Sequence, residues 1–361
     1  PTYFPYIQGF EVGWNNLDQS GVILGSAVDS NLRWEKTSSF NVGAEIGLFK
    51  NRITVNFDYF QKKSVDLIYD KPLPGSTGNT PSSIVTNVGS IKNDGWELDI
   101  TSKNFKNENF EWTTNLNLYK FKNKITELTQ ESFINGTKRW AVGTSLYDFY
   151  LAEWAGVDPQ TGMGTWYYSV TNTDGTVSRE ITSNYTLANA TGSRIYKGSS
   201  LPDITGGFGN YFRYKSFDLN ILFNFSYGAY MYDSQYAALM SGFSAAGSQQ
   251  SVDVMNAWQK PGDITDVPIN IMVQNNNNAQ STRFLYKNDY VRLKSLTLGY
   301  NVNSSLTKSF GVNQFRIFLQ GDNLWTWQSH NGIDPEQSIA GTTNYRSYNL
   351  RTMSLGVTIG F

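Results

Sequence analysis

Few side chains in this 361-residue chain could perform covalent or acid–base chemistry. The chain has one histidine, His330, and no cysteine, which excludes disulfides and thiolate metal sites. Ser-His-Asp catalysis would depend on His330, and a polar residue at the base of a loop is the simpler interpretation. The Asp-Gly pair within residues 173–176 lacks the spaced carboxylates of a calcium loop and indicates a turn. We therefore predict that the protein is not an enzyme, with no catalytic residues, no metal site and no cofactor.

Aromatic side chains in expected loops are the candidates for contact with a ligand. Tyr, Phe and Trp make up 15% of the residues, whereas charged residues make up only 16%. An aromatic ring can stack on the apolar face of a sugar or pack against a peptide side chain. It can equally hold one loop against another, and the sequence leaves both roles open. The candidate substrate-binding residues are Trp140, Tyr147, Trp327, Tyr345 and Tyr348.

The elements that would position these rings alternate between apolar and polar residues. The last nine residues are the clearest case, because every second side chain from Met353 to Phe361 is apolar and no charge interrupts that face. Successive side chains of a strand point to opposite faces, so this pattern predicts a strand. In a transmembrane barrel it would be the closing strand, with Phe361 as the terminal aromatic that marks insertion into the outer membrane.

The period-two rule predicts about eleven strands. Several span roughly ten residues, the length that a tilted strand needs to cross a bilayer, whereas soluble strands usually span about five or six. Short and long connections alternate, as in outer-membrane barrels with short periplasmic turns and long extracellular loops. The expected strands cover residues 38–49, 52–70, 85–103, 109–124, 149–157, 164–170, 205–214, 217–229, 284–300, 314–328 and 345–361.

Polar side chains on the other strand face are expected to point into the lumen of such a barrel. Water or a polar plug can satisfy them there, whereas a charge facing lipid is costly. The alternative is the solvated face of a soluble β-sandwich. The expected lumen-facing residues are Asn41, Glu45, Asn56, Asp58, Glu97, Asp99, Asn115, Asn117, Asn220 and Asn224.

An odd set of about eleven strands does not close a barrel. An open sheet in lipid would leave two rows of backbone groups unpaired, at several kcal/mol for each group. We therefore predict that residues 1–37 form an extracellular segment leading into the barrel. Residues 38–361 would then form the C-terminal half of the barrel, and a second polypeptide or an N-terminal segment would supply the rest.

Six short motifs occur in a fixed order along the chain. They are residues 31–37 (NLRWEKT), 87–98 (NVGSIKNDGWEL), 214–219 (YKSFDL), 289–300 (DYVRLKSLTLGY), 321–325 (GDNLW) and 332–336 (GIDPE). Together they resemble the C-terminal half of the SusC/RagA-type TonB-dependent transporters of Bacteroidetes outer membranes. Residues 256–261 (NAWQKP) resemble a recurrent loop phrase of that family, which favours a loop-packing role for Trp258.

The resemblance implies an all-β fold, with these strands as the last eleven of a 22-stranded barrel plugged by an N-terminal domain. It also implies TonB-dependent import of a bulky nutrient across the outer membrane, and we favour an oligosaccharide over a peptide. A SusD-like lipoprotein would cap the extracellular mouth. The plug and TonB box are expected upstream and are absent from this chain, so TonB would act through the missing N-terminal region.

Two other classes of protein share the same periodicity. A passive porin would have the same strands without a plug, and a soluble carbohydrate-binding β protein would need no membrane. Nucleic acid is not an expected partner, because the net charge is −1 and no basic block is present.

Overall fold

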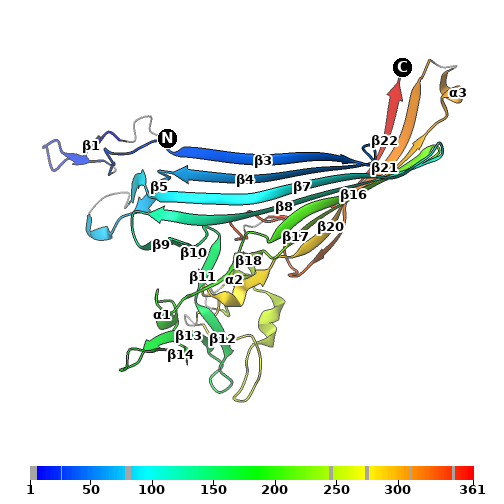
Figure 1. Ribbon diagram of the computed structural model, residues 1–361. Helices are drawn as coiled ribbons and strands as arrows, with labels where there is room; N and C mark the ends of the chain where they lie inside the picture. Colours follow the sequence, from blue (N-terminus) through cyan, green and yellow to red (C-terminus); the bar gives the residue numbers. More distant parts are fainter. Residues whose placement is uncertain are drawn as a thin grey trace.

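The computed structural model describes residues 6–25, 27–77, 83–243, 247–272, 276–308, 311–343 and 346–361. Its largest element is a curved antiparallel sheet of nine strands in the order β22-β21-β20-β17-β16-β8-β7-β4-β3 (Figure 1). The strands are β3 (Lys36–Leu48), β4 (Ile53–Val65), β7 (Gly89–Lys106), β8 (Phe110–Leu128), β16 (Ile204–Tyr214), β17 (Phe217–Tyr227), β20 (Tyr290–Asn301), β21 (Gln314–Gln328) and β22 (Thr352–Gly360). We call this sheet the wall.

The wall has short turns at one end and long connections at the other (Figure 1). The turn from β3 to β4 places Phe49, Lys50 and Asn51 at φ of 53°, 58° and 62°, and Lys215 between β16 and β17 has φ of 51°. Residues in this left-handed backbone conformation allow the chain to reverse direction within a few positions. Helix α3 (Ser304–Thr307) lies at the same end, between β20 and β21.

The predicted all-β antiparallel fold is confirmed, but the strand count is corrected. The segments predicted as barrel strands at 149–157 and 164–170 do not join the wall. They supply β11 (Asp148–Leu151), β12 (Glu153–Val157) and β13 (Gly164–Thr171), which pair in separate small sheets. These strands have 4 to 8 residues, against 9 to 19 in the wall, so they are too short to cross a bilayer.

Before β3 lies a hairpin of β1 (Phe10–Val12) and β2 (Val22–Leu24). The wall begins at Lys36, two residues before the predicted boundary. The extracellular position of residues 1–37 stays a prediction. A second hairpin, β5 (Ile68–Pro72) and β6 (Ser83–Asn87), continues the connection between β4 and β7, with η1 (Gly75–Thr77) between its strands.

The long connections fold together into a second region, which we call the loop layer. One sheet contains β9 (Ser132–Asn135), β10 (Lys138–Ala141), β11 and β15 (Ile195–Ser199), and another contains β12, β13 and β14 (Val177–Thr182). A third contains β18 (Tyr230–Tyr232) and β19 (Leu285–Lys287). The helices of the loop layer are α1 (Tyr185–Ala188), α2 (Ser234–Leu239), η2 (Val252–Asn256) and η3 (Thr282–Phe284).

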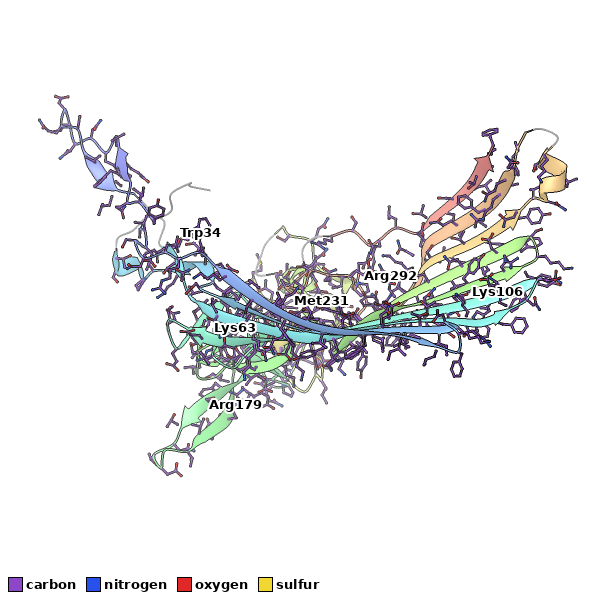
Figure 2. The ribbon with its side chains drawn as sticks, turned by 45° about the horizontal axis from the view of Figure 1, so that its top comes forward. Trp34, Lys63, Lys106, Arg179, Met231 and Arg292 are labelled. Atoms are coloured by element: carbon purple, nitrogen blue, oxygen red, sulfur yellow. The ribbon has the colours of Figure 1, made fainter. Side chains whose placement is uncertain are left out.

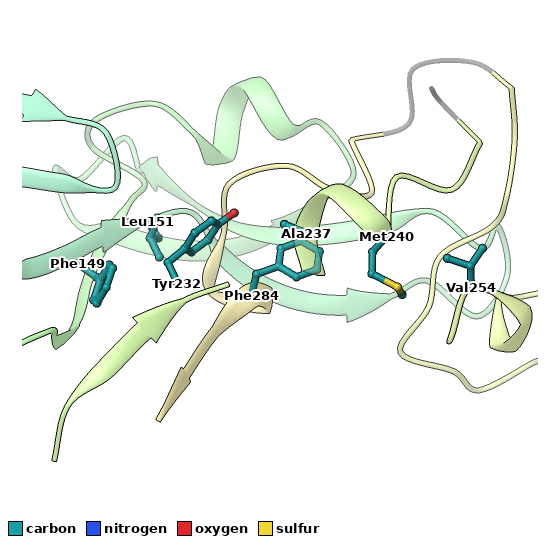
Figure 3. Close-up of a cluster of buried hydrophobic side chains, with 7 residues drawn as sticks. All are labelled: Phe149, Leu151, Tyr232, Ala237, Met240, Val254 and Phe284. Carbon is teal, nitrogen blue, oxygen red and sulfur yellow. The ribbon is translucent and has the colours of Figure 1, made fainter. Parts of the chain in front are cut away.

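The larger of two buried apolar clusters among the described residues lies in the loop layer. Phe149, Leu151, Tyr232, Ala237, Met240, Val254 and Phe284 form it (Figure 3). The wall has the opposite arrangement, because its apolar side chains face outward. Met353 and Leu355, for example, are 79% and 77% exposed. An apolar sheet face without protein cover is typical of a strand that contacts lipid. Among the described residues no helix has the length and apolar character needed to span a bilayer.

Candidate functional site

Polar side chains line one face of the wall in register. Directly paired residues of neighbouring strands share a face, so the strand pairing fixes this arrangement. One continuous row is Glu45, Asn56, Asp99, Asn117, Gly207, Asn224, Arg292 and Thr326. Even spacing along the regular strands adds Asn41, Asp58, Glu97, Asn115 and Asn220 to the same face. All ten predicted lumen-facing residues therefore lie on one face; that this face borders a lumen stays a prediction.

Three of these residues line a shared concavity. Asn41, Asp58 and Glu97 surround a space of about 260 Å³ together with Phe60, Lys62 and Tyr119. Phe60 and Tyr119 stack with ring centroids 6.0 Å apart, and the ammonium group of Lys62 lies 5.9 Å from the Phe60 ring centroid. The polar face thus offers carboxylates, an amide and flat rings within one hollow.

Two of the predicted substrate-binding aromatics come together in the loop layer. Trp140 and Tyr147 line a pocket of about 420 Å³ formed by β9, β10 and the segment near Thr342. Trp140 packs against two other rings, since its ring centroid lies 5.0 Å from those of Tyr69 and Phe133. Its Nε1 donates to the carbonyl of Leu146. Its position is therefore fixed by packing before any ligand arrives.

Lys138 lines the same pocket and was not anticipated from the sequence. Its Nζ donates to the carbonyl of Tyr147 at 2.6 Å and to Oγ of Ser200 at 3.2 Å, and it lies 3.1 Å from the ring centroid of Phe149. Burial lowers the pKa of Lys138 to about 7, against the opposing influence of the Asp148 carboxylate. A lone lysine in a strand of four residues carries no sequence signal of this burial.

A buried ion pair joins the loop layer to the polar face of the wall. Arg292 in β20, 2% exposed, pairs with Asp334 at 2.9 Å between Nη2 and Oδ1, and with Glu336 at 3.2 Å. The amides of Glu336 and Asn349 donate to Asp334. We call this group the clasp. It connects two motifs seen in the sequence, residues 289–300 and 332–336, whose contact the sequence did not predict.

Loop segments fold over the polar face at the end of the wall that bears the long connections. On β8, Oδ1 of Asn123 accepts the backbone amide of Leu146 at 2.8 Å and the hydroxyl of Ser145 at 3.2 Å. Asn123 has the same parity as Asn117 on β8, so this contact is on the polar side. The loop layer and the clasp thus cover the same face of the wall.

The remaining candidate residues are dispersed. Trp327 lies within β21, not in a loop, and pairs with Val291 on the apolar face, which corrects its predicted position. Tyr348 is 47% exposed and does not line the pocket of Trp140, and Tyr345 lies outside the described residues. Phe361 follows β22 and is 86% exposed. A role for any of these in substrate binding or membrane insertion stays a prediction.

Trp258 packs between loops, as predicted. It is 8% exposed, and its Nε1 donates to the carbonyl of Pro159 at 2.9 Å. His330 likewise has a packing role: it stacks on Tyr286 with centroids 3.8 Å apart and lies 3.0 Å from the Asp233 carboxylate. Among the described residues no group of three or more His, Cys, Asp or Glu side chains could hold a metal.

Long antiparallel strands with an outward apolar face and a polar opposite face define a class, the outer-membrane β-barrels. The family model described as TonB dependent receptor-like, beta-barrel matches residues 1–210. The chain belongs to this family of TonB-dependent receptor barrels, and its outer-membrane location follows from that membership.

The chain is similar to several curated relatives and to solved structures. TonB-dependent receptor P3 of Formosa agariphila is 32% identical, over 95% of this chain and 36% of P3. TonB-dependent receptor SusC of Bacteroides thetaiotaomicron is 25% identical, over 86% of this chain and 30% of SusC. The solved structure of the RagAB peptide transporter matches with a TM-score of 0.82 and 27% identity, over 99% of this chain and 39% of that chain. The resemblance to SusC/RagA-type transporters is confirmed, and the chain spans well under half the length of each relative.

Proposed function

We propose that this chain forms part of the wall and extracellular loops of a TonB-dependent importer of bulky nutrients. The observation that carries the proposal is the row from Glu45 to Thr326, polar at every position except Gly207, on the face opposite the exposed apolar side chains. A polar row of this length suits an aqueous path or a polar plug.

The two edge strands support closure by strands from outside this chain. Within the described residues β3 and β22 each pair on one side only. Unpaired backbone groups in lipid are costly, so these edges would pair with the remainder of the barrel. A plug inside that barrel would connect to TonB, and a SusD-like lipoprotein would bind over the loop layer.

An oligosaccharide is the proposed substrate class. The predicted lumen face is rich in asparagine amides, which can both donate to and accept from sugar hydroxyls. Trp140 and Tyr147 line a pocket large enough for a sugar unit, and aromatic faces stack on sugar rings. A peptide is the second candidate, favoured by the similarity to the RagAB peptide transporter.

Uptake by cells expressing the full-length protein tests the proposal. We expect Trp140→Ala and Tyr147→Ala to reduce oligosaccharide binding and uptake by roughly tenfold, the loss of one or two aromatic contacts. Trp34→Ala is the matched control, because Trp34 is an exposed tryptophan outside the pocket. Uptake of peptides and not of oligosaccharides would transfer the proposal to the second candidate, and diffusion independent of TonB would overturn it.

A further inference from the structure

The outward face of β4, β7 and β8 changes character in successive rows towards the long-loop end. Phe57, Leu98 and Leu118 form an apolar row. The next row is Tyr59, Trp96 and Lys120, followed by Gln61, Asp94 and Lys122, and then by Lys63, Lys92 and Lys124. Towards the long-loop end, the side chains of this face therefore change from apolar to aromatic and then to cationic. We call the five lysines of the last three rows the basic patch.

The basic patch is not neutralised by the protein. Lys63, Lys92 and Lys124 are directly opposite one another on adjacent strands, an arrangement of like charges that is destabilising by itself. Lys92 forms an ion pair with Asp94 at 3.4 Å, and it is the one lysine of the patch with an ion pair among the described residues. Five lysines and one aspartate leave four positive charges on this surface.

A pocket adjoins the basic patch on the side of β16. It has a volume of about 370 Å³ and is lined by Lys120, Lys122 and Lys124 of β8. Asp148 and Asp203 also line it, from the loop layer and the start of β16, but neither lies within 4 Å of a patch lysine in an ion pair. Because Asp94 lines it as well, the pocket has three lysines and three aspartates and no net charge, so the cationic surface is the outward face of the strands and not this pocket.

The height of the patch matches the headgroup layer of a bilayer. Each row advances by two residues, or about 6.6 Å along a strand, and a tilt of about 45° reduces this to roughly 5 Å across the membrane. The last two rows therefore lie roughly 5 and 9 Å beyond the aromatic row, which places the first within the interfacial layer of about 5–7 Å per leaflet and the second at its outer edge. Figure 2 shows Lys63 towards the long-loop end of the wall and Lys106 towards the opposite end.

We propose that the basic patch binds the phosphate groups of anionic lipids in the outer leaflet of the outer membrane. The patch continues the apolar face outward, so a lipid packed against Leu98 and Leu118 would bring its headgroup to the lysines. A soluble polyanion has no acyl chains to pack against the apolar rows, so the apolar face next to the lysines would not strengthen its binding. Further along the wall the outward face ends differently, in Tyr227, Val291 and Trp327, so within this chain phosphate binding would be confined to β4, β7 and β8.

Native mass spectrometry of the full-length protein in detergent tests the proposal. The probes are a diphosphorylated lipid A, the same lipid without its phosphates, and inorganic phosphate. At about 1 kcal/mol for each lysine near an anionic lipid surface, the variant Lys63→Gln/Lys92→Gln/Lys124→Gln should bind the phosphorylated lipid roughly a hundredfold more weakly at low salt. The variant with arginine at the same three positions should retain binding, which separates lost charge from faulty assembly.

A second triple variant, Lys50→Gln/Lys106→Gln/Lys215→Gln, is the matched control, because it removes the same charge from the short-turn end of the wall. It should leave lipid binding unchanged. Equal binding of the lipid without phosphates, or equal loss in both triple variants, would overturn the proposal. Displacement of the lipid by inorganic phosphate at comparable concentration would overturn it as well, because it would indicate a site for a free anion.

Discussion

The wall and the loop layer bury opposite kinds of side chain. In the wall, residues such as Met353 and Leu355 face outward without protein cover, and the polar side chains face the loop layer. In the loop layer, Phe149, Phe284 and Trp166 are almost fully buried, and the buried charged groups of Asp233 and Lys138 are hydrogen-bonded. The wall therefore depends on lipid and on strand register, whereas the loop layer depends on close packing as a soluble domain does.

The substitution with the largest expected effect destabilises the loop layer and leaves the wall unchanged. Phe284→Ala removes a ring that is 1% exposed and packs against Tyr232 and Tyr236. Such a truncation costs about 3–5 kcal/mol. Hydrogen exchange of the full-length protein should show rapid exchange across α2 and β11 with unchanged protection in β7 and β8. Met272→Ala is the control, since Met272 is 81% exposed. Global loss of protection would contradict the division into two regions.

The second-largest expected effect comes from a substitution on the outward face of the wall, which impairs assembly of the barrel. Phe223→Arg places a charge on the apolar face of β17, opposite Phe208 and Leu293 in the middle of the wall, at a cost of about 2–4 kcal/mol near the bilayer midplane. We expect a strong decrease in the yield of assembled protein in outer-membrane fractions. Asn220→Ala and Asn224→Ala, on the same strand but the polar face, should assemble nearly normally. Equal tolerance of both sets would refute the assignment of the two faces.

The sequence predicts which residues share a strand face, because the alternation of apolar and polar residues is a property of each strand alone. It requires no knowledge of which strands pair. The same locality explains the errors. Residues 149–157 and 164–170 alternate well enough, but alternation does not tell which sheet a strand joins. Arg292 and Asp334 are 42 positions apart, and their contact depends on how the intervening loop folds. Lys138 is buried by Tyr147, Phe149 and Ser200, which lie outside β10, so the sequence of β10 alone does not predict this burial.

A smaller effect tests the contact that joins the two regions. Asp334→Asn keeps the shape of the clasp but removes the charge that pairs with the buried Arg292, and a charged hydrogen bond of this kind contributes about 1.5–3 kcal/mol. We expect lower protection of residues 332–336 in hydrogen exchange, while the core around Phe284 is unaffected. Glu180→Gln is the control, because Glu180 is an exposed acid of the loop layer. Loss of protection around Phe284 as well would mean that the clasp supports the whole loop layer.

The smallest effect depends on pH and concerns Asp233, which is 1% exposed. Burial alone would raise the pKa of its carboxyl, but the hydrogen bonds from His330 and from the amide of Tyr236 outweigh burial, and the pKa is lowered. A lowered folded pKa means that the unfolded state binds the proton more readily. The contribution to stability is therefore present above the unfolded value of about 3.9 and is lost as the pH falls through the folded value.

Hydrogen exchange of α2 between pH 5 and lower pH measures this loss, after correction for the intrinsic pH dependence of exchange. Wild-type protein should lose protection of α2 as the pH falls below about 4, whereas Asp233→Asn should start less protected and change little. Asp174→Asn is the matched control, since Asp174 lies in an exposed turn and should leave the profile of α2 unaltered. If the Asp233→Asn profile retains the full pH dependence, another carboxylate governs the acid sensitivity of the loop layer. Because the wall strands β7 and β8 do not contain this pair, their protection should be the same across the pH range in both proteins.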